Sequence, residues 1–402
     1  MRNLKSMLLG AVALASLALP AAAQVNVKIG VLSDMSSLYA DLGGAGSVAA
    51  ARLAIEDFNA AAKGMRVEIV SADHQNRADV GSNIARQWFD RDGVDVVVDV
   101  PNSGVALAVN GVTREKNKVF LVSGAATSAL TGEQCSPNTV HWTYDTWALA
   151  NGTGKAIVQQ GGDTWFFLTA DYAFGHQLEA DTSAVVNKLG GRVVGSVRHP
   201  LNGSDFSSFL LQAQASRAKI IGVANAGGDT INTIKQAGEF GIVRRGQSLA
   251  GLLIFISDVH GLGLEAAQGL VFTDAFYWDA NDGTRAFARR IAAANRGVHP
   301  TMVHAGVYAS VTHYLKAVEA NKSAADGKAT VDRMKAMPTD DPLFGKGTVR
   351  ADGRKIHDMY LYEVKKPSES KGPWDYYKLR ATIPAAEAFR PLAEGKCPIA
   401  GS

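Results

Sequence analysis

The chain has 402 residues, of which 47% are hydrophobic and 20% charged, and its formal net charge is +3. This composition is typical of a globular protein long enough for two domains, and it excludes wholesale disorder. The basic residues form only short pairs, such as Arg244-Arg245 and Lys365-Lys366, so we expect no nucleic-acid partner, which would need a clustered basic face.

The first 23 residues have the three parts of an export signal. Arg2 and Lys5 supply a positive start, residues 7–19 form an apolar run, and residues 21–23 are a small-residue cleavage site. We therefore expect residues 1–23 to be a signal peptide that is cleaved near Ala23. The apolar run is shorter than a membrane span, and no cysteine follows the cleavage site, so no membrane or lipid anchor is expected.

Strand-length apolar runs then alternate with helix-length amphipathic segments. Repeated βα order predicts a mostly parallel sheet with helices on both faces. The predicted strands cover residues 28–32, 66–71, 94–100 and 119–122, and the predicted helices cover residues 46–61, 80–90 and 104–115.

A second series of the same kind begins after Asp145, which predicts an α/β fold with two similar lobes. Two helices after this series have no new strand between them and are predicted to return to the first lobe, and the tail alternates like a hairpin. The predicted helices cover residues 147–160, 174–189, 205–216, 230–240, 284–295 and 302–320, and the predicted strands cover residues 165–169, 192–198, 220–224, 252–256, 270–273, 359–364 and 374–381.

The chain has two cysteines, Cys135 and Cys397. In an exported protein an even pair favours a disulfide over two free buried thiols. Such a bond would tether the C-terminal tail to the loop after Thr131.

Catalytic and metal-binding signatures are scarce. The sequence has no Gly-x-Ser-x-Gly elbow and no His-Glu-x-x-His helix, and its nine histidines are scattered. We therefore expect neither an enzyme nor a metal site, and no cofactor.

Three loops that follow predicted strands are rich in small and hydroxyl residues: 34–43, 101–104 and 123–128. In open α/β sheets, ligands sit beyond the carboxyl ends of the strands. Small residues let backbone N–H groups approach a ligand, hydroxyls add donors, and helix N-termini favour anions. The loops together predict a site for a carboxylate; the alternative is that small residues simply begin tightly packed helices.

At these loops the chain resembles a known family, the periplasmic solute-binding proteins of the branched-chain amino acid (leucine/isoleucine/valine) type, which feed ABC importers. The likeness covers nearly the whole mature chain. It lies in residues 27–36 and 39–46, and in the segments Ser123-Gly-Ala-Ala-Thr127, Asp171-Tyr-Ala-Phe-Gly175, Asp205-Phe-Ser-Ser-Phe209, Phe344-Gly-Lys-Gly347 and Asp352-Gly353.

The resemblance implies two doubly wound, Rossmann-like lobes joined by three short crossovers, which close on a ligand like a hinged trap. Lobe 1 would comprise residues 24–144 plus 274–356, and lobe 2 residues 145–273 plus 357–402. The resemblance also implies a periplasmic location, and we expect a monomer.

Roles for individual residues follow from the same resemblance. Ser103 after the third strand, and Ala125, Ala126 and Thr127 after the fourth, would bind the ligand carboxylate. Tyr39 or Leu42 would shield the ligand in the first lobe. Phe174, with Tyr172 beside it, would cover the ligand from the second lobe; tyrosine is common at the position of Phe174, so a less polar ligand than an amino acid would suit this cleft.

The family's amino acid binders use a second-lobe acid for the ammonium group. Asp229 and Asp258 are the candidates here, and either could instead be a helix cap. Trp142, Tyr144 and Trp147 flank the first crossover and are expected to pack at the hinge rather than contact the ligand.

The expected function is therefore capture of a small carboxylate and its delivery to the membrane permease of an ABC importer. The carboxylate could be a branched-chain or other amino acid, or a related organic or aromatic acid. A ligand-sensing receptor of the same fold is the second reading, and an exported hydrolase is the least favoured.

Overall fold

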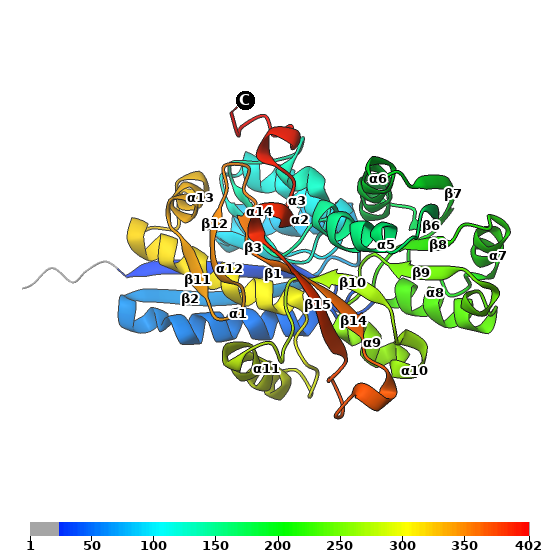
Figure 1. Cartoon of the computed structure of the whole chain (residues 1–402). Helices are drawn as coiled ribbons and strands as arrows, with labels where there is room; N and C mark the ends of the chain where they lie inside the picture. The colour runs from blue at the N-terminus through cyan, green and yellow to red at the C-terminus, as the bar shows by residue number, and fades with distance from the viewer. Residues whose placement is uncertain (1–23, 402) are drawn as a thin grey trace, which may run out of the picture.

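The computed structural model contains two parallel β-sheets, and each sheet is covered by helices on both faces (Figure 1). The structure describes residues 24–401, so the predicted signal peptide lies outside the described residues. The predicted α/β fold with two Rossmann-like lobes is confirmed. Within residues 24–401, no helix has the length and apolar character needed to cross a membrane.

The sheet of lobe 1 has the strand order β2-β1-β3-β4-β5, and all of its strands are parallel. Alternate residues serve opposite faces: Val96 and Val98 pack with α1 and α12, whereas Val97 packs with α2 and α3. The strands are β1 (Val25–Ser33), β2 (Met65–Asp73), β3 (Val96–Asp99), β4 (Val119–Val122) and β5 (Thr139–His141), and the helices are α1 (Gly44–Phe58), α2 (Ala78–Gln87), α3 (Ser103–Glu115), α11 (Asp282–Ala294), α12 (Met302–Asn321) and α13 (Gly327–Ala336).

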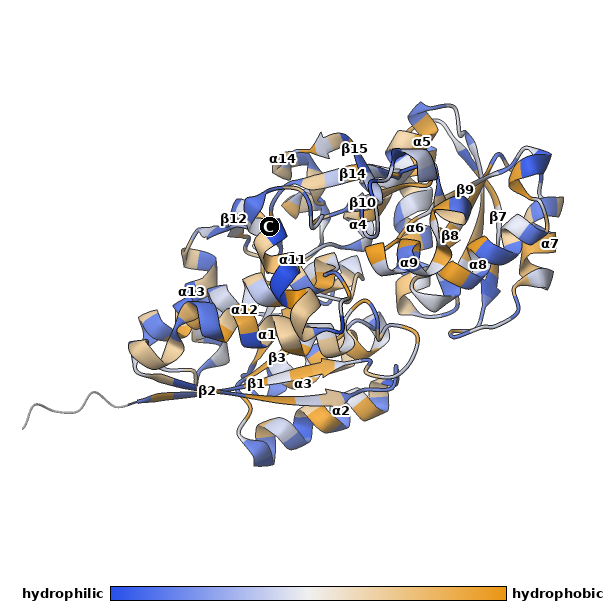
Figure 2. Ribbon diagram, turned by 90° about the horizontal axis from the view of Figure 1, so that it is seen from below, coloured by the Kyte–Doolittle hydropathy of each residue, from blue (hydrophilic) through white to orange (hydrophobic). Residues whose placement is uncertain are grey.

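The sheet of lobe 2 repeats this winding, with the order β7-β6-β8-β9 and parallel strands throughout. Figure 2 shows apolar residues gathered along the strands and the helix faces that cover them. The strands are β6 (Thr164–Ala170), β7 (Arg192–His199), β8 (Ile220–Ala224) and β9 (Ser248–Gly251), and the helices are α4 (Thr146–Leu149), α5 (Lys155–Gln159), α6 (Ala173–Lys188), α7 (Ser207–Ala215), α8 (Gly228–Glu239), α9 (Ile256–Leu262) and α10 (Leu264–Ala267).

A third, antiparallel sheet lies between the lobes and consists of β10 (Val271–Asp274), β14 (Met359–Val364) and β15 (Tyr377–Ile383) (Figure 1). The predicted tail hairpin is therefore present as β14 and β15. The two helices predicted to return to lobe 1, α11 and α12, both pack against α1. The short strands β11 (Thr339–Asp341), β12 (Gly345–Val349) and β13 (Lys355–Ile356) and the helix α14 (Ala385–Ala388) complete the chain.

One predicted strand is wrong. Residues 252–256 form no strand, because β9 ends at Gly251 and α9 begins at Ile256. Leu252 and Phe255 are fully buried in the connecting loop and belong to a core cluster with members from both lobes, so this loop has an apolar run like that of a strand. The prediction also missed β5, α9, α10, α13 and the sheet of β11 to β13, all of which are short or lack a clear period.

A buried arginine joins two of the segments that connect the lobes. Arg354 directly precedes β13, in the segment that leads to β14, and is fully buried. Its Nη1 donates to the carbonyl of Tyr144 at 3.1 Å and lies 3.4 Å from the carboxylate of Asp145, which accepts from Ala148 N and begins α4. Burial lowers the pKa of Arg354 to about 10, so the guanidinium stays charged at neutral pH and holds the two segments together.

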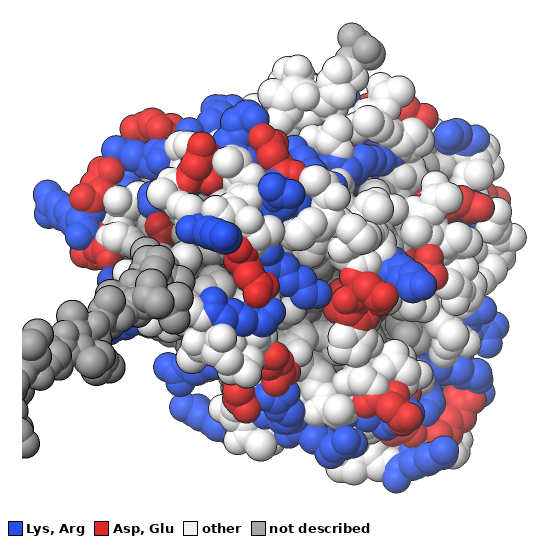
Figure 3. All heavy atoms as spheres, turned by 90° about the vertical axis from the view of Figure 1, so that its left-hand side faces the viewer, with Lys and Arg blue, Asp and Glu red and all other residues white. Residues whose placement is uncertain are grey.

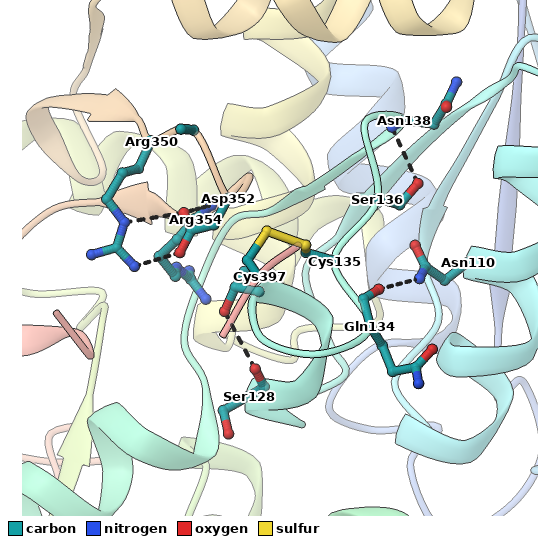
Figure 4. Close-up of a disulfide and its surroundings, with 12 residues drawn as sticks. Asn110, Ser128, Gln134, Cys135, Ser136, Asn138, Arg350, Asp352, Arg354 and Cys397 are labelled. Atoms are coloured by element: carbon teal, nitrogen blue, oxygen red, sulfur yellow. Dashed lines mark hydrogen bonds and ion pairs between the residues drawn. A yellow bond between two sulfur atoms is a disulfide. The ribbon is translucent and has the colours of Figure 1, made fainter. Parts of the chain in front are cut away.

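Cys135 and Cys397 form a disulfide, with their Cα atoms 5.6 Å apart (Figure 4). The bond joins the C-terminal tail to the loop between β4 and β5, next to the segment that holds Arg350, Asp352 and Arg354. Residues 357–402 were expected in lobe 2 as a whole, but this bond ties the last of them to lobe 1.

The surface carries both signs of charge. On the lobe 1 end of the molecule, Lys and Arg side chains lie among Asp and Glu side chains and form no single basic field (Figure 3). Several are paired, such as Arg66 with Glu68 at 2.9 Å and Lys118 with Asp95 at 3.0 Å. This face lacks the clustered positive charge of a nucleic-acid-binding surface.

Replacing both cysteines (Cys135→Ser with Cys397→Ser) should lower the free energy of unfolding by about 2–5 kcal/mol, because the bond constrains a very long loop in the unfolded chain. Calorimetric unfolding with and without a reductant checks this. The reductant should lower the Tm of the wild type and leave that of the double variant unchanged; equal Tm values for oxidised wild type and variant would contradict the prediction.

Candidate ligand-binding site

A cavity lies between the two lobes, at the carboxyl ends of both sheets. Each lining residue follows a parallel strand: β1, β3, β4 and β5 in lobe 1, and β6, β8 and β9 in lobe 2. This is where an open α/β sheet binds ligands. The lining residues are Tyr39, Leu42, Pro101, Gly124, Ala126, Tyr144, Tyr172, Phe174, Ala226, Leu253 and Phe255.

The lobes are closed over this cavity. Its volume is about 10 Å³, which is the room that one water needs. The hydroxyls of Tyr39 and Tyr172 are hydrogen-bonded across the lobes at 2.5 Å. Gly227 has a φ of +59°, and a Cβ there would lie 2.5 Å from the carbonyl oxygen of Leu38, so glycine is required where the second lobe meets the loop after β1.

Two lobe 1 loops form a group of donors beside the cavity. Asn102 accepts from Val105 N at 3.1 Å and begins α3. Ser103 Oγ accepts from Thr127 N at 3.2 Å, and Thr127 Oγ1 accepts from Ala129 N at 3.4 Å. Within residues 24–401, neither hydroxyl donates to another group, so both hydrogens are free for a ligand. An anion here would also meet the positive end of α3.

The backbone leading to α3 is strained. Asp99 has a φ of +80° and Val100 a φ of +54°. A β-branched residue in this region is a conformational outlier that costs about 1–3 kcal/mol and is typical of functional sites. The strain places Pro101 in the cavity wall and the N-terminus of α3 directly behind it.

Asp99 itself lies beneath these loops. Its side chain is fully buried and accepts from Ser33 Oγ at 2.8 Å, while Ser33 Oγ accepts from Gly44 N at 3.0 Å. Its second oxygen has no hydrogen-bond partner among the described residues. Burial raises the pKa of Asp99 to about 6, because no cation compensates the desolvated charge.

The structure brings most of the predicted site residues together. Tyr39, Leu42, Ala126, Tyr172 and Phe174 line the cavity. Ser103, Ala125 and Thr127 lie in the same lobe 1 loops, next to lining residues, and are buried. Their roles toward a ligand stay predictions.

The two candidate acids of lobe 2 do not line the cavity. Asp229 accepts from the backbone N–H groups of Asn202 and Gly203 at 3.1 and 3.0 Å. Asp258 accepts from Phe255 N at 2.9 Å and completes the first turn of α9, as expected for a helix cap. Burial raises the pKa of Asp229 to about 6 and that of Asp258 to about 7.

The sequence analysis missed part of the wall. Tyr144 was expected to pack at the hinge, yet it lines the cavity and donates to the carbonyl of Gly124 at 2.5 Å. Phe255 and Leu253 were placed inside a strand, and Ala226 was assigned no role. The position of Ala226 after the predicted strand 220–224 was an available signal, since Pro101 and Gly124 were assigned to candidate ligand loops by that criterion. No such signal was available for Leu253 and Phe255, because the predicted strand 252–256 contained them.

A second group of contacts between the lobes adjoins the donor loop. Asp181 of α6 accepts from Ser128 Oγ at 2.8 Å and from Thr146 Oγ1 at 2.7 Å. Arg390 of the tail donates to Ser128 Oγ at 2.6 Å and to Asp181 at 3.3 Å. The carboxylate of Asp181 in lobe 2 is therefore held by three segments: the lobe 1 loop at Ser128, the start of α4 at Thr146, and the tail at Arg390.

Within residues 24–401, no cluster of three or more His, Cys, Asp or Glu side chains could hold a metal ion. The residues that line the cavity offer hydrogen bonding and apolar contact.

The chain is similar to known proteins in sequence and in structure. The family model described as "Periplasmic binding protein" matches residues 26–372. A periplasmic binding protein from Burkholderia mallei is 54% identical, with 93% of this chain and 99% of that one covered and a TM-score of 0.90. A branched chain amino acid ABC transporter periplasmic ligand-binding protein from Burkholderia xenovorans LB400 is 43% identical, with 93% and 100% covered and a TM-score of 0.82. The Leu/Ile/Val-binding protein homolog 6 of Brucella melitensis is 26% identical, with 91% of this chain and 94% of that one covered.

The raised pKa of Asp99 predicts a pH dependence of stability. The pKa of Asp99 is about 6 in the folded protein, whereas the ordinary value is 3.8. Asp99 therefore contributes fully to the free energy of unfolding below about pH 4, and this contribution is lost as the pH rises through about 6. At about 1.4 kcal/mol per pKa unit, the loss is about 3 kcal/mol. Asp99→Asn should therefore gain up to this amount relative to wild type between pH 4 and pH 8.

Denaturant unfolding at several pH values measures this difference. Asp340→Asn, at an exposed aspartate, is the matched control and should leave the pH dependence unchanged. If Asp99→Asn and wild type lose stability in parallel between pH 4 and pH 8, Asp99 is not the group that carries the effect.

Proposed function

Because the chain belongs to the periplasmic binding protein family, we propose that it is the substrate-binding component of an ABC importer and captures a small carboxylate between its lobes. The family resemblance seen in the sequence is confirmed, and the family is one of transport proteins rather than of enzymes. The proposed cycle is capture in the periplasm, closure, and release of the unchanged ligand to the membrane permease.

The observation that carries this proposal is the pairing of an inter-lobe cavity with uncommitted donors at the start of α3. Ser103 and Thr127 supply hydroxyl hydrogens there. A carboxylate accepts up to four hydrogen bonds, and donors held in place by other bonds lose little entropy when they bind it. No covalent step is needed.

Closure follows from the division of the site. Lobe 1 holds the donors, whereas Tyr172 and Phe174 reach the cavity from lobe 2. A ligand bound to lobe 1 of the open protein contacts only the lobe 1 half of the site. Closure adds the contacts with lobe 2, and the free energy of these contacts favours the closed form. Asp181 adds a contact to Ser128 of lobe 1 that exists only when the lobes meet.

Thr127→Ala should weaken binding of the carboxylate by about 1.5–3 kcal/mol, because it removes one donor to a charged oxygen. A thermal-shift screen across carboxylates identifies the ligand, since a hundredfold excess over Kd adds about 2.7 kcal/mol of stability. Calorimetric titration then measures the affinity.

Two control variants separate the ligand contact from local folding. Thr127→Ser keeps the hydroxyl and should keep the affinity. Thr131→Ala removes a hydroxyl that donates to Ser128 O in the short 3-10 helix Ser128–Thr131, directly after Thr127; Thr131 does not line the cavity, and this variant should bind normally. Unchanged affinity in Thr127→Ala would reject Thr127 as a ligand contact.

Asp181→Asn should raise the Kd roughly 3–10-fold, about 1 kcal/mol, by weakening the charged contacts of the closed form without touching the ligand. Asp163→Asn, which removes an exposed lobe 2 carboxylate paired with Lys219, is the matched control. Small-angle scattering without ligand should show a more open average shape for Asp181→Asn; a Kd and a scattering profile identical to those of the control would count against the role in closure.

A further inference from the structure

The wall of the cavity carries no charge. Its side chains are aromatic, aliphatic or small, and among residues 24–401 no Asp, Glu, Lys or Arg lines it. An ammonium group has three N–H donors and no acceptor, so it needs oxygen partners wherever it is buried. Burying it without an acidic partner costs several kcal/mol.

The buried acids near the cavity either hold backbone groups or lie behind the cavity wall. Asp229 holds the backbone of Asn202 and Gly203, and Asp258 holds Phe255 N. Asp99 lies behind the wall, because a Cβ at Gly124 would come within 2.7 Å of its Oδ1. The backbone of Gly124 therefore separates this carboxylate from the cavity.

The uncommitted polar groups of the site are donors. The hydroxyls of Tyr39 and Tyr172 share one hydrogen bond. This bond uses one of their two hydrogens, so the other hydrogen is free to donate to a ligand. Ser103 and Thr127 each keep one as well, while Tyr144 has given its hydrogen to Gly124 O. These hydrogens can donate to the oxygens of a carboxylate and of a second acceptor such as an oxo group. They cannot pair with an ammonium group, which has only donors.

We infer that the ligand is a carboxylic acid without an ammonium group, with an apolar or aromatic body, rather than an amino acid. The inference rests on the proposed function and narrows it to one chemical class. Because the closed cavity has room for one water only, the lobes must stand further apart to hold the acid; its body then lies between aromatic rings of both lobes, and the donors of lobe 1 hold its carboxylate.

Matched pairs of acids test this inference. Each pair has one carbon skeleton and differs in an oxo or an amino group: α-ketoisocaproate and leucine, α-ketoisovalerate and valine, phenylpyruvate and phenylalanine; benzoate is added as an acid without either group. The whole mature protein is unfolded and refolded with its disulfide intact to remove bound solute, and each acid is titrated by calorimetry.

We expect the acids without an ammonium group to bind, and each oxo acid to bind at least tenfold more tightly than its amino acid. An amino acid that binds as tightly as its oxo acid would overturn the inference and leave the proposed function standing. If no acid of the panel binds, the proposed capture of a carboxylate fails together with the inference.

A designed variant tests the cause. Ala226 is buried in the lobe 2 wall, and Ala226→Asp adds the carboxylate that the cavity lacks. Ala226→Asn has the same shape without the charge and is the matched control. The ratio of amino acid to oxo acid affinity should rise at least tenfold in Ala226→Asp relative to Ala226→Asn; an equal ratio in the two variants would show that a missing acid does not set the preference. If Ala226→Asp does not fold, the wild-type pairs decide.

Discussion

The polarity of the parallel strands is the constraint on which this structure depends. In both sheets the strands are parallel, so the segments that follow neighbouring strands lie at the same edge of the sheet. All the residues that line the cavity come from segments that follow β1, β3, β4, β5, β6, β8 or β9. The site is thus built from segments far apart in the chain, and neither lobe contains it alone.

The connections between the lobes determine how the two halves of the site meet. Arg354 holds the first crossover to the segment before β14, and the disulfide holds the tail to lobe 1. The tail then reaches back through Arg390 to Ser128 and Asp181. Because Ser128 is the neighbour of Thr127, the contacts that hold the lobes together and the loop proposed to hold the ligand share one short stretch of chain.

The buried carboxylates support the walls rather than offering charge to the cavity. Asp229 and Asp258 each hold backbone N–H groups at the start of a loop or helix, and Asp99 holds Ser33 beneath the loop after β1. Desolvation raises the pKa of each of them, which shows that no cation lies close enough to compensate. What remains open to a ligand is a set of hydroxyl donors among aromatic rings.

The sequence by itself determined the two-lobed α/β architecture, because the helical and strand periods are local and repeat in order along the chain. It also located the loops 34–43, 101–104 and 123–128, whose small residues follow buried strands and which contribute lobe 1 residues to the cavity wall. Only the tertiary structure decided that Leu253 and Phe255 line the cavity instead of lying in a strand, that Tyr144 faces the cavity, and that Asp229 holds the backbone of Asn202 and Gly203. An apolar run has the same pattern whether it is buried in a sheet or between two lobes. The partners of Asp229 lie 27 and 26 residues away along the chain, so they are set by how the loops pack and not by a local pattern.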